Sequence, residues 1–248
     1  DLNPDRYMPT EELIDNGFAV LSVYYNDITS DDGDFTNGLA GVLFENGERG
    51  DTDCGKIAMW AWAAQRILDY AETLPNKLDI SRSVVCGHSR LGKTALFAGA
   101  TDERFAFSYS NDSGCSGAAI ARGTAAGGER IADICRNFPF WFCENYKKYC
   151  NNEENMPFDQ HYLVASIAPR KVLIGSASED KWADPLSEML CCVASSHAFN
   201  KSFTYDDRPP QINDKFLDGD IGYHMRKGLH YFSREDWLRL IEFVKLHS

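Results

Sequence analysis

The sequence has too few basic residues for two large classes of partner. Its 248 residues include 25 lysines and arginines against 37 aspartates and glutamates, which gives a net charge of −12. Nucleic acids and anionic membranes are bound by basic faces, so this charge balance argues against both. An anionic substrate stays compatible with it, because one local cluster of Arg and Lys can bind such a group. The chain also has no apolar run long enough to span a bilayer and no secretory signal at its start.

Metal-binding patterns are lacking as well. The eight cysteines form no Cys-x-x-Cys pair with zinc spacing, and no His-x-x-x-His pair is present. We therefore expect no metal and no other cofactor. Cys54 and Cys86 fall in a predicted helix and strand, which suits reduced thiols. Cys135, Cys143 and Cys150 are close enough in sequence for one disulfide, so the cysteines leave the redox compartment open.

What the sequence does contain is a regular alternation of strand and helix patterns. Strands are predicted at 17–25, before Gly87, and at 104–110, 170–177 and 219–226, and helices at 9–15, 53–72, 94–100, 185–198 and 233–247. The polar segment 26–51 is predicted to be a long loop. Such alternation predicts an α/β fold with a mostly parallel sheet, helices on both faces, and one domain over 1–248. Ligands of such sheets bind beyond the carboxyl ends of the strands.

The most specific motif is Gly-His-Ser-Arg-Leu-Gly-Lys at residues 87–93. A β-branched run precedes it and a helical pattern follows, as in a nucleophile elbow, where a tight turn lifts a serine hydroxyl clear of the sheet. The Gly-x-Ser-x-x-Gly spacing is one residue longer than usual. The motif predicts Ser89 as a nucleophile at the positive end of a helix. The alternative is an ordinary strand–helix turn in which Ser89 only caps the helix.

A nucleophilic serine needs a histidine base and a carboxylate that holds the base. Of the six histidines, His230 follows the last predicted strand and precedes the last helix, which is where the base of an α/β-hydrolase lies. The others stand inside the elbow, in helical stretches, in the last strand or at the terminus, at positions 88, 161, 197, 224 and 247. Two carboxylates compete as the acid, Asp112 and Asp180, because each follows a predicted strand. Asp112 has a second interpretation as a turn residue.

With these residues in place, the chain resembles the glucuronoyl esterases of carbohydrate esterase family 15 (CE15), above all their bacterial members. The resemblance rests on residues 87–93 and continues through 110–115, 138–142, 159–161, 179–185 and 222–224. It implies the α/β-hydrolase fold. That fold has four strands before the elbow strand, whereas one is predicted here. We therefore expect the first strands to be missing from this chain and to come from an N-terminal segment or a second chain.

The resemblance also implies an activity. The family hydrolyses esters of (4-O-methyl-)glucuronic acid on xylan, as in lignin–carbohydrate linkages, through a Ser-His-acid acyl-enzyme mechanism. It assigns Ser89 as nucleophile and His230 as base. Its acid position, usually Glu, matches Asp112, and because Asp is shorter, Asp180 stays as the alternative. It further implies a secreted or periplasmic protein that acts on glucuronoxylan or lignin-carbohydrate esters.

Other site residues are implied by the same resemblance. Arg90 matches a residue that stabilises the oxyanion, Lys93 one that contacts sugar hydroxyls, and Glu129 and Trp182 further sugar-contacting positions. Three of them have an alternative: Arg90 as a solvated arginine, Lys93 as a helix-surface lysine, and Trp182 as a packed tryptophan. Two other functions stay open. One is an acetyl-xylan or other short-chain carbohydrate esterase, which would need neither Arg90 nor Lys93. The other is a non-catalytic carbohydrate-binding pseudo-hydrolase or an inactive fragment.

Overall fold

A five-stranded sheet forms the centre of the computed structural model, which describes residues 8–123 and 127–248. The strands lie in the order β1-β2-β3-β5-β4, and all neighbours are parallel except β4 and β5. Their bounds are Val84–His88 (β1), Phe107–Asn111 (β2), Lys171–Ala177 (β3), Lys215–Phe216 (β4) and Ile221–Arg226 (β5). The expectation of a mostly parallel sheet is therefore confirmed. The four parallel strands end at the same edge, where the loops that follow them meet.

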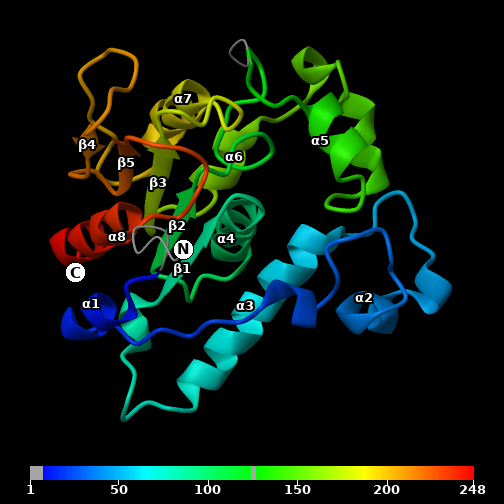
Figure 1. Ribbon diagram of the computed structural model, residues 1–248, viewed down its shortest axis with the longest axis horizontal. Coiled ribbons are helices and arrows are strands. Elements are labelled where there is room, and N and C mark those ends of the chain that lie inside the picture. The colour runs from blue at the N-terminus through cyan, green and yellow to red at the C-terminus, as the bar shows by residue number, and fades with distance from the viewer. Residues whose placement is uncertain (1–7, 124–126) are drawn as a thin grey trace.

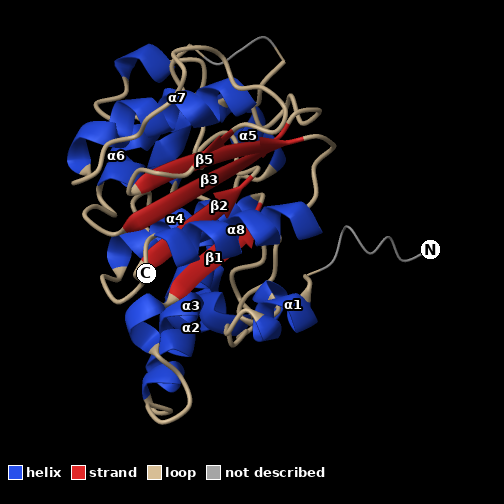
Figure 2. Cartoon of the chain, turned by 90° about the vertical axis from the view of Figure 1, so that its left-hand side faces the viewer, coloured by secondary structure: helices blue, strands red, loops and turns tan. Residues whose placement is uncertain are grey.

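Helices cover both faces of this sheet (Figures 1 and 2). The α-helices are α1 Thr10–Asp15, α2 Gly38–Leu43, α3 Lys56–Glu72, α4 Arg90–Thr101, α5 Ile131–Asn137, α6 Gln160–Ala165, α7 Pro185–Ser195 and α8 Arg234–Leu246. Short 3₁₀ turns occupy Tyr25–Asp27, Glu45–Gly47, Ile80–Arg82, Glu144–Tyr149, Glu153–Asn155 and Ser196–Ala198.

The two faces are filled by alternate side chains of the strands. In β3, Val172 and Ile174 pack with α4, α6 and α7 in one apolar cluster. Leu173 points to the other face, where it packs with Trp237 of α8 and Leu13 of α1. Figure 2 shows α8 crossing that face. The sheet is therefore buried on both sides, as a parallel sheet requires.

Helix α8 begins where the sequence predicts. Ser233 is its N-cap and accepts a hydrogen bond from the backbone of Asp236, whose side chain accepts in return from Ser233. This reciprocal capping box fixes the start of the helix and buries the Asp236 carboxylate. The segment that links β5 to α8, residues 227–232, is thereby held at both ends.

The strand predicted at 17–25 is wrong. Residues 18–24 are irregular, and β1 pairs with β2 alone among the strands of the described chain. Leu21 and Val23 stay 48% and 43% exposed. An apolar extended run becomes a strand only when a neighbouring strand pairs with its backbone, and no strand of the described residues pairs with this run. Besides the 3₁₀ turns, three α-helices and one strand were not predicted: α2, which lies inside the expected loop 26–51, and α5, α6 and β4.

The structure also bears on two smaller expectations, a possible disulfide and the absence of a membrane-spanning segment. All eight cysteines are free thiols, so residues 135, 143 and 150 form no disulfide in this structure. Within the residues that the structure describes, each helix is too short or too polar to cross a bilayer.

Candidate active site

Ser89 occupies a sharp bend between β1 and α4. Its backbone has a positive φ of 58° with ψ −125°, a conformation that costs energy for a non-glycine residue. Its N–H donates to the carbonyl of Asn111 at 2.9 Å, which anchors the bend to β2. Gly87 is required because a Cβ there would lie 2.2 Å from the carbonyl oxygen of Leu91. The local structure is the strand, turn and helix that the motif predicts.

The bend brings Ser89 to a histidine from the far end of the chain. The Oγ of Ser89 lies 2.9 Å from Nε2 of His230, and Nδ1 of His230 lies 2.5 Å from Oδ2 of Asp180. The three side chains come from the turns and loops that follow β1, β5 and β3. They meet because parallel strands present their carboxyl ends at one edge. A serine, an imidazole and a carboxylate in a hydrogen-bonded row can activate the serine for nucleophilic attack.

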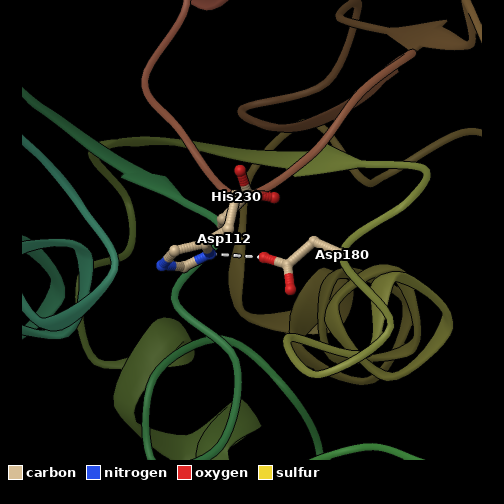
Figure 3. Close-up of side chains that lie close together, drawn as sticks. All are labelled: Asp112, Asp180 and His230. Atoms are coloured by element: carbon tan, nitrogen blue, oxygen red, sulfur yellow. Dashed lines mark hydrogen bonds and ion pairs between the residues drawn. The ribbon is translucent and has the colours of Figure 1, made fainter.

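Asp112, the acid favoured by the sequence match, has no hydrogen bond to His230 in the structure. Its Oδ1 accepts from the N–H of Ala177 at 2.6 Å, and its Oδ2 accepts from Nη2 of Arg226 at 3.3 Å. Figure 3 shows the contact from His230 to Asp180 and none to Asp112. Both carboxyl oxygens of Asp112 therefore already have hydrogen-bond partners other than His230. The carboxylate that contacts the imidazole is thus the alternative, Asp180.

The environment of Asp112 also disfavours its charged form. The residue is 2% exposed, and burial together with the nearby Glu188 raises the pKa of Asp112 well above its ordinary value, against the lowering effect of Arg226. A carboxyl group whose charged form is disfavoured stabilises a neighbouring imidazolium less well. Geometry and electrostatics therefore agree in separating the two aspartates.

Asp112, Asp180 and His230 form the one group of possible metal ligands found among the described residues, with ligand atoms within 4.8 Å of one another. Both ring nitrogens of His230 already face hydrogen-bond partners, Ser89 and Asp180. The cluster therefore fits a hydrogen-bonded site better than a coordination sphere. The absence of a metal stays a prediction.

A cleft opens above Ser89 and collects most of the predicted site residues. Its lining includes every predicted site residue except Asp180, together with two aromatic residues that were not proposed as site residues. The lining residues are Ser89, Arg90, Lys93, Asp112, Ser113, Gly114, Glu129, Phe138, Trp141, Trp182, Ala183 and His230. Phe138 and Trp141 stack face to face, with ring centroids 3.8 Å apart.

Arg90 is held at the cleft by a partner that the sequence did not reveal. Its guanidinium pairs with the carboxylate of Asp31 and lies 4.8 Å from the ring centroid of Trp141. The indole N–H of Trp141 donates to the other oxygen of Asp31 at 2.7 Å. Arg90 is thus a fixed group rather than a solvated arginine. Asp31 lies in the polar segment 26–51, where several aspartates look alike in sequence.

Lys93, Glu129 and Trp182 form a polar wall of the cleft. Lys93 is buried, its Nζ donates to the carbonyl of Ser113, and burial lowers its pKa while Glu129 raises it. The side chain of Glu129 hydrogen-bonds the side chain of Trp182, and Trp182 is 49% exposed. Lys93 is therefore not a surface lysine, and Trp182 is not a core tryptophan.

Of the remaining histidines, His88 lies closest to the predicted base. The ring centroids of His88 and His230 are 4.4 Å apart, and Nδ1 of His88 hydrogen-bonds the side chain of Asn111 at 2.8 Å. Burial and the neighbouring His230 lower the pKa of His88 to about 4, so its ring is neutral near pH 7. His224 and His247 bind Tyr109 and the carbonyl of Leu217, away from Ser89.

The fold and the serine–histidine–carboxylate row are those of an α/β-hydrolase. The model of one protein family, described as "Glucuronyl esterase, fungi", matches residues 7–202. A carbohydrate esterase from an unknown prokaryotic organism is 40% identical over 243 residues, 96% of this chain and 55% of its own length. The chain belongs to the glucuronoyl esterase family.

Two further relatives come from a fungus and a marine source. A 4-O-methyl-glucuronoyl methylesterase of Wolfiporia cocos is 32% identical over 190 residues, 73% of this chain and 46% of its own length. The solved structure of a promiscuous CE15 esterase from a marine bacterial metagenome superposes with a TM-score of 0.87 at 39% identity, covering 98% of this chain and 62% of that one. The chain thus spans about half the length of the curated relatives.

Proposed function

We propose that this chain is a serine carboxylesterase that hydrolyses esters of (4-O-methyl-)glucuronic acid on xylan, as in lignin–carbohydrate linkages. The observation that carries the proposal is the row from Ser89 through His230 to Asp180 at the mouth of a cleft. Family membership supports the same reaction class, because a relative is named 4-O-methyl-glucuronoyl methylesterase. The proposed chemistry uses side chains and water alone and needs no cofactor.

In the proposed mechanism, Nε2 of His230 accepts the proton of Ser89 as the serine oxygen attacks the ester carbonyl. Asp180 stabilises the imidazolium that forms and keeps the ring in the tautomer whose Nε2 can accept. The proton then passes to the alcohol as it leaves, and the acyl group stays on Ser89. A water molecule, activated by the same histidine, releases the uronic acid and restores the serine.

Oxyanion stabilisation is proposed for Arg90. It is the first residue of α4, so its backbone N–H is among the helix donors that have no partner within the helix. The guanidinium adds a positive charge, and Asp31 and Trp141 hold it at the cleft. Losing one such donor typically costs about 10²–10³ in kcat.

The uronic acid ring is proposed to bind against Lys93, Glu129 and Trp182. A buried ammonium and a carboxyl group can hydrogen-bond sugar hydroxyls, and a half-exposed indole offers a stacking surface. The cavity measures about 170 Å³, below the range of about 300–1,000 Å³ for pockets that enclose a drug-sized ligand. It therefore suits one end of a polymer, with the rest of the xylan outside.

Turnover of benzyl glucuronate by the whole chain tests the proposal. We expect release of benzyl alcohol, loss of that release in Ser89→Ala, and covalent labelling of Ser89 by a fluorophosphonate in the wild type only. Circular dichroism with a cooperative melt shows whether each protein is folded. A folded wild type without turnover or labelling, indistinguishable from Ser89→Ala, would favour a carbohydrate-binding pseudo-hydrolase or an inactive fragment.

A second candidate is an acetyl-xylan or other short-chain carbohydrate esterase, which is favoured by the description of one close structural relative as promiscuous. Kinetics on methyl glucuronate and on 4-nitrophenyl acetate separate the two. An Arg90→Ala variant sharpens the result. Loss on both esters indicates a general oxyanion role, whereas loss on the glucuronate ester alone indicates recognition of the acid.

We also propose that residues 1–248 act as one catalytic domain of a secreted or periplasmic protein. The edge of β1 is proposed to pair with strands from outside these residues, supplied by an N-terminal segment or a second chain. The exposed side chains of Leu21 and Val23 and the single partner of β1 support this extension. Strand addition at that edge would raise the melting temperature when the missing segment is co-expressed.

A further inference from the structure

Arg226 ends β5 and points into the protein at the place where the loop carrying His230 begins. Arg226 is 1% exposed, and its side chain is the largest among the fully buried ones of the described residues. A buried guanidinium is costly unless its donors are satisfied, so the identity of its partners indicates what it holds in place. The mechanism proposed above gives this arginine no part.

Its donors are directed at the backbone on both sides of His230. Nη1 donates to the carbonyl of Lys227 at 3.3 Å, and Nη2 donates to the carbonyls of Leu229, at 3.2 Å, and Tyr231. The ring of Tyr231 lies over the guanidinium, 4.3 Å from its central carbon. The residues immediately before and after the base are therefore bound to one nitrogen.

The guanidinium is itself anchored to two buried carboxyl groups. Nε donates to Oδ2 of Asp236 at 2.6 Å, and Nη2, whose two N–H groups are shared among three acceptors, also lies 3.3 Å from Oδ2 of Asp112. Asp236 belongs to the capping box of α8, and Asp112 follows β2 and is bound to the N–H of Ala177. Arg226 thus joins the loop to one helix and two strands.

The same loop is also bound to the turn that carries Asp180. The N–H of Ser178 donates to the carbonyl of Arg226 at 2.9 Å, and the N–H of Glu179 donates to the carbonyl of Gly228 at 2.8 Å. Gly228 has a φ of +128°, which only glycine adopts readily. The loop with the base and the turn with the acid are therefore built as one unit around Arg226.

We propose that Arg226 is the positioning residue of His230, and that Asp112 serves this site as an anchor of Arg226. The inference rests on the proposed function, because it concerns the same base. A planar guanidinium spreads five N–H donors over three nitrogens and can contact three carbonyls and two carboxyl groups, with the two N–H groups of Nη2 shared among three of them, whereas the ammonium of a lysine has three donors on one atom. Without the arginine, the imidazole drifts from the line between Ser89 and Asp180.

Arg226→Lys is the main test, measured with benzyl glucuronate across pH. We expect kcat to fall about 10- to 100-fold, because misplacement of about 1 Å can cost 10²-fold, while KM changes less than about twofold. The groups that face the imidazole are Asp180, Asp112 and His88. Loosening its contact with Asp180 removes support for the imidazolium, so the acidic limb of the kcat/KM profile moves to lower pH. Loss of stability alone would not move that limb.

Arg170→Lys is the matched control. Nη1 of Arg170 also hydrogen-bonds backbone carbonyls, those of Gly99 at 2.7 Å and of Asp102 and Phe105 at 3.0 Å. Arg170 directly precedes β3 and therefore lies at the end of the sheet opposite to His230. We expect this variant to melt at a lower temperature than the wild type and to keep the kcat and the pH profile of the wild type.

A second variant keeps the test open if Arg226→Lys does not fold. Asp112→Asn can still accept from Ala177 but turns N–H donors toward the guanidinium, so kcat should fall about three- to tenfold with the same shift of the acidic limb. A folded Arg226→Lys with wild-type kcat and pH profile, or equal losses in Arg170→Lys, overturns the inference. So does a wild-type profile in Asp112→Asn when Arg226→Lys is unfolded. Absence of turnover in the wild type overturns the proposed function instead.

Discussion

Asp112 and Asp180 follow neighbouring parallel strands and are both buried, yet their surroundings give them opposite chemistry. Asp112 is enclosed by Arg226 and the backbone of Ala177, with Glu188 raising its pKa further. Asp180 accepts from the N–H of Ala183 at 3.2 Å with one oxygen and presents the other to His230. The role of a carboxylate at this edge of the sheet is thus decided by whether one oxygen is left for the imidazole, and burial alone does not distinguish the two.

The largest expected effect tests this difference directly. Asp180→Asn should lower kcat/KM on benzyl glucuronate about 10⁴-fold, because the amide holds the imidazole in the wrong tautomer and cannot stabilise the imidazolium. Asp112→Asn should cost at most about tenfold, through Arg226 alone. The reverse ranking in two folded variants would make Asp112 the acid and Asp180 a turn residue.

The second effect concerns stability near Asp112. Glu188 accepts from the N–H of Gly114 at 2.9 Å and from Oγ of Ser176 at 2.5 Å, and burial raises its pKa from 4.5 to about 7. Because the folded chain then holds a proton that the unfolded chain has released, raising the pH from 4.5 to 7 lowers the free energy of unfolding. The contribution is on the order of 3 kcal/mol at 1.36 kcal/mol per pH unit.

Glu188→Gln should remove that contribution. Urea unfolding between pH 4.5 and 7 should show a flatter dependence in the variant than in the wild type, since glutamine has no proton to release. Equal slopes in the two proteins would mean that Glu188 ionises normally in the folded state. The region around Asp112 would then disfavour an ionised carboxyl group no more than the turn of Asp180 does.

The sequence predicted much of this site because its signals are local. The elbow at Ser89 is fixed by Gly87 and the helix that follows, and the order of strands and helices places His230 at the same edge. The choice between the two aspartates was out of reach, because it depends on the long-range contact of Arg226 with Asp112. The link from Asp31 to Arg90 joins segments 59 residues apart and leaves no local pattern.

The fold was predicted less completely at its first edge. The apolar run at 17–25 satisfies the composition of a strand, but a strand also needs a neighbour, which a single sequence segment does not reveal. The helices α5 and α6, which were missed, span only seven and six residues, so their apolar residues carry little periodicity. Conversely, the helix predicted at 233–247 begins where expected, at the N-cap Ser233, since a capping box depends on only four residues.

The smallest expected effects come from the residues that directly follow the two aspartates. Ser113 is buried: its Oγ donates to Glu188 at 3.3 Å and accepts from the N–H of Ala118 at 2.9 Å. Ser113→Ala leaves that N–H without a partner and should lower the free energy of unfolding by about 1–3 kcal/mol. Lys181 is exposed, so Lys181→Ala should change it by less than about 0.5 kcal/mol. Chemical denaturation of both variants at one pH measures the contrast. Similar losses in the two variants would mean that the turn of Asp180 is as tightly constrained as the segment that follows β2. The contact of His230 with Asp180 rather than Asp112 would then follow from the positions of the strands alone.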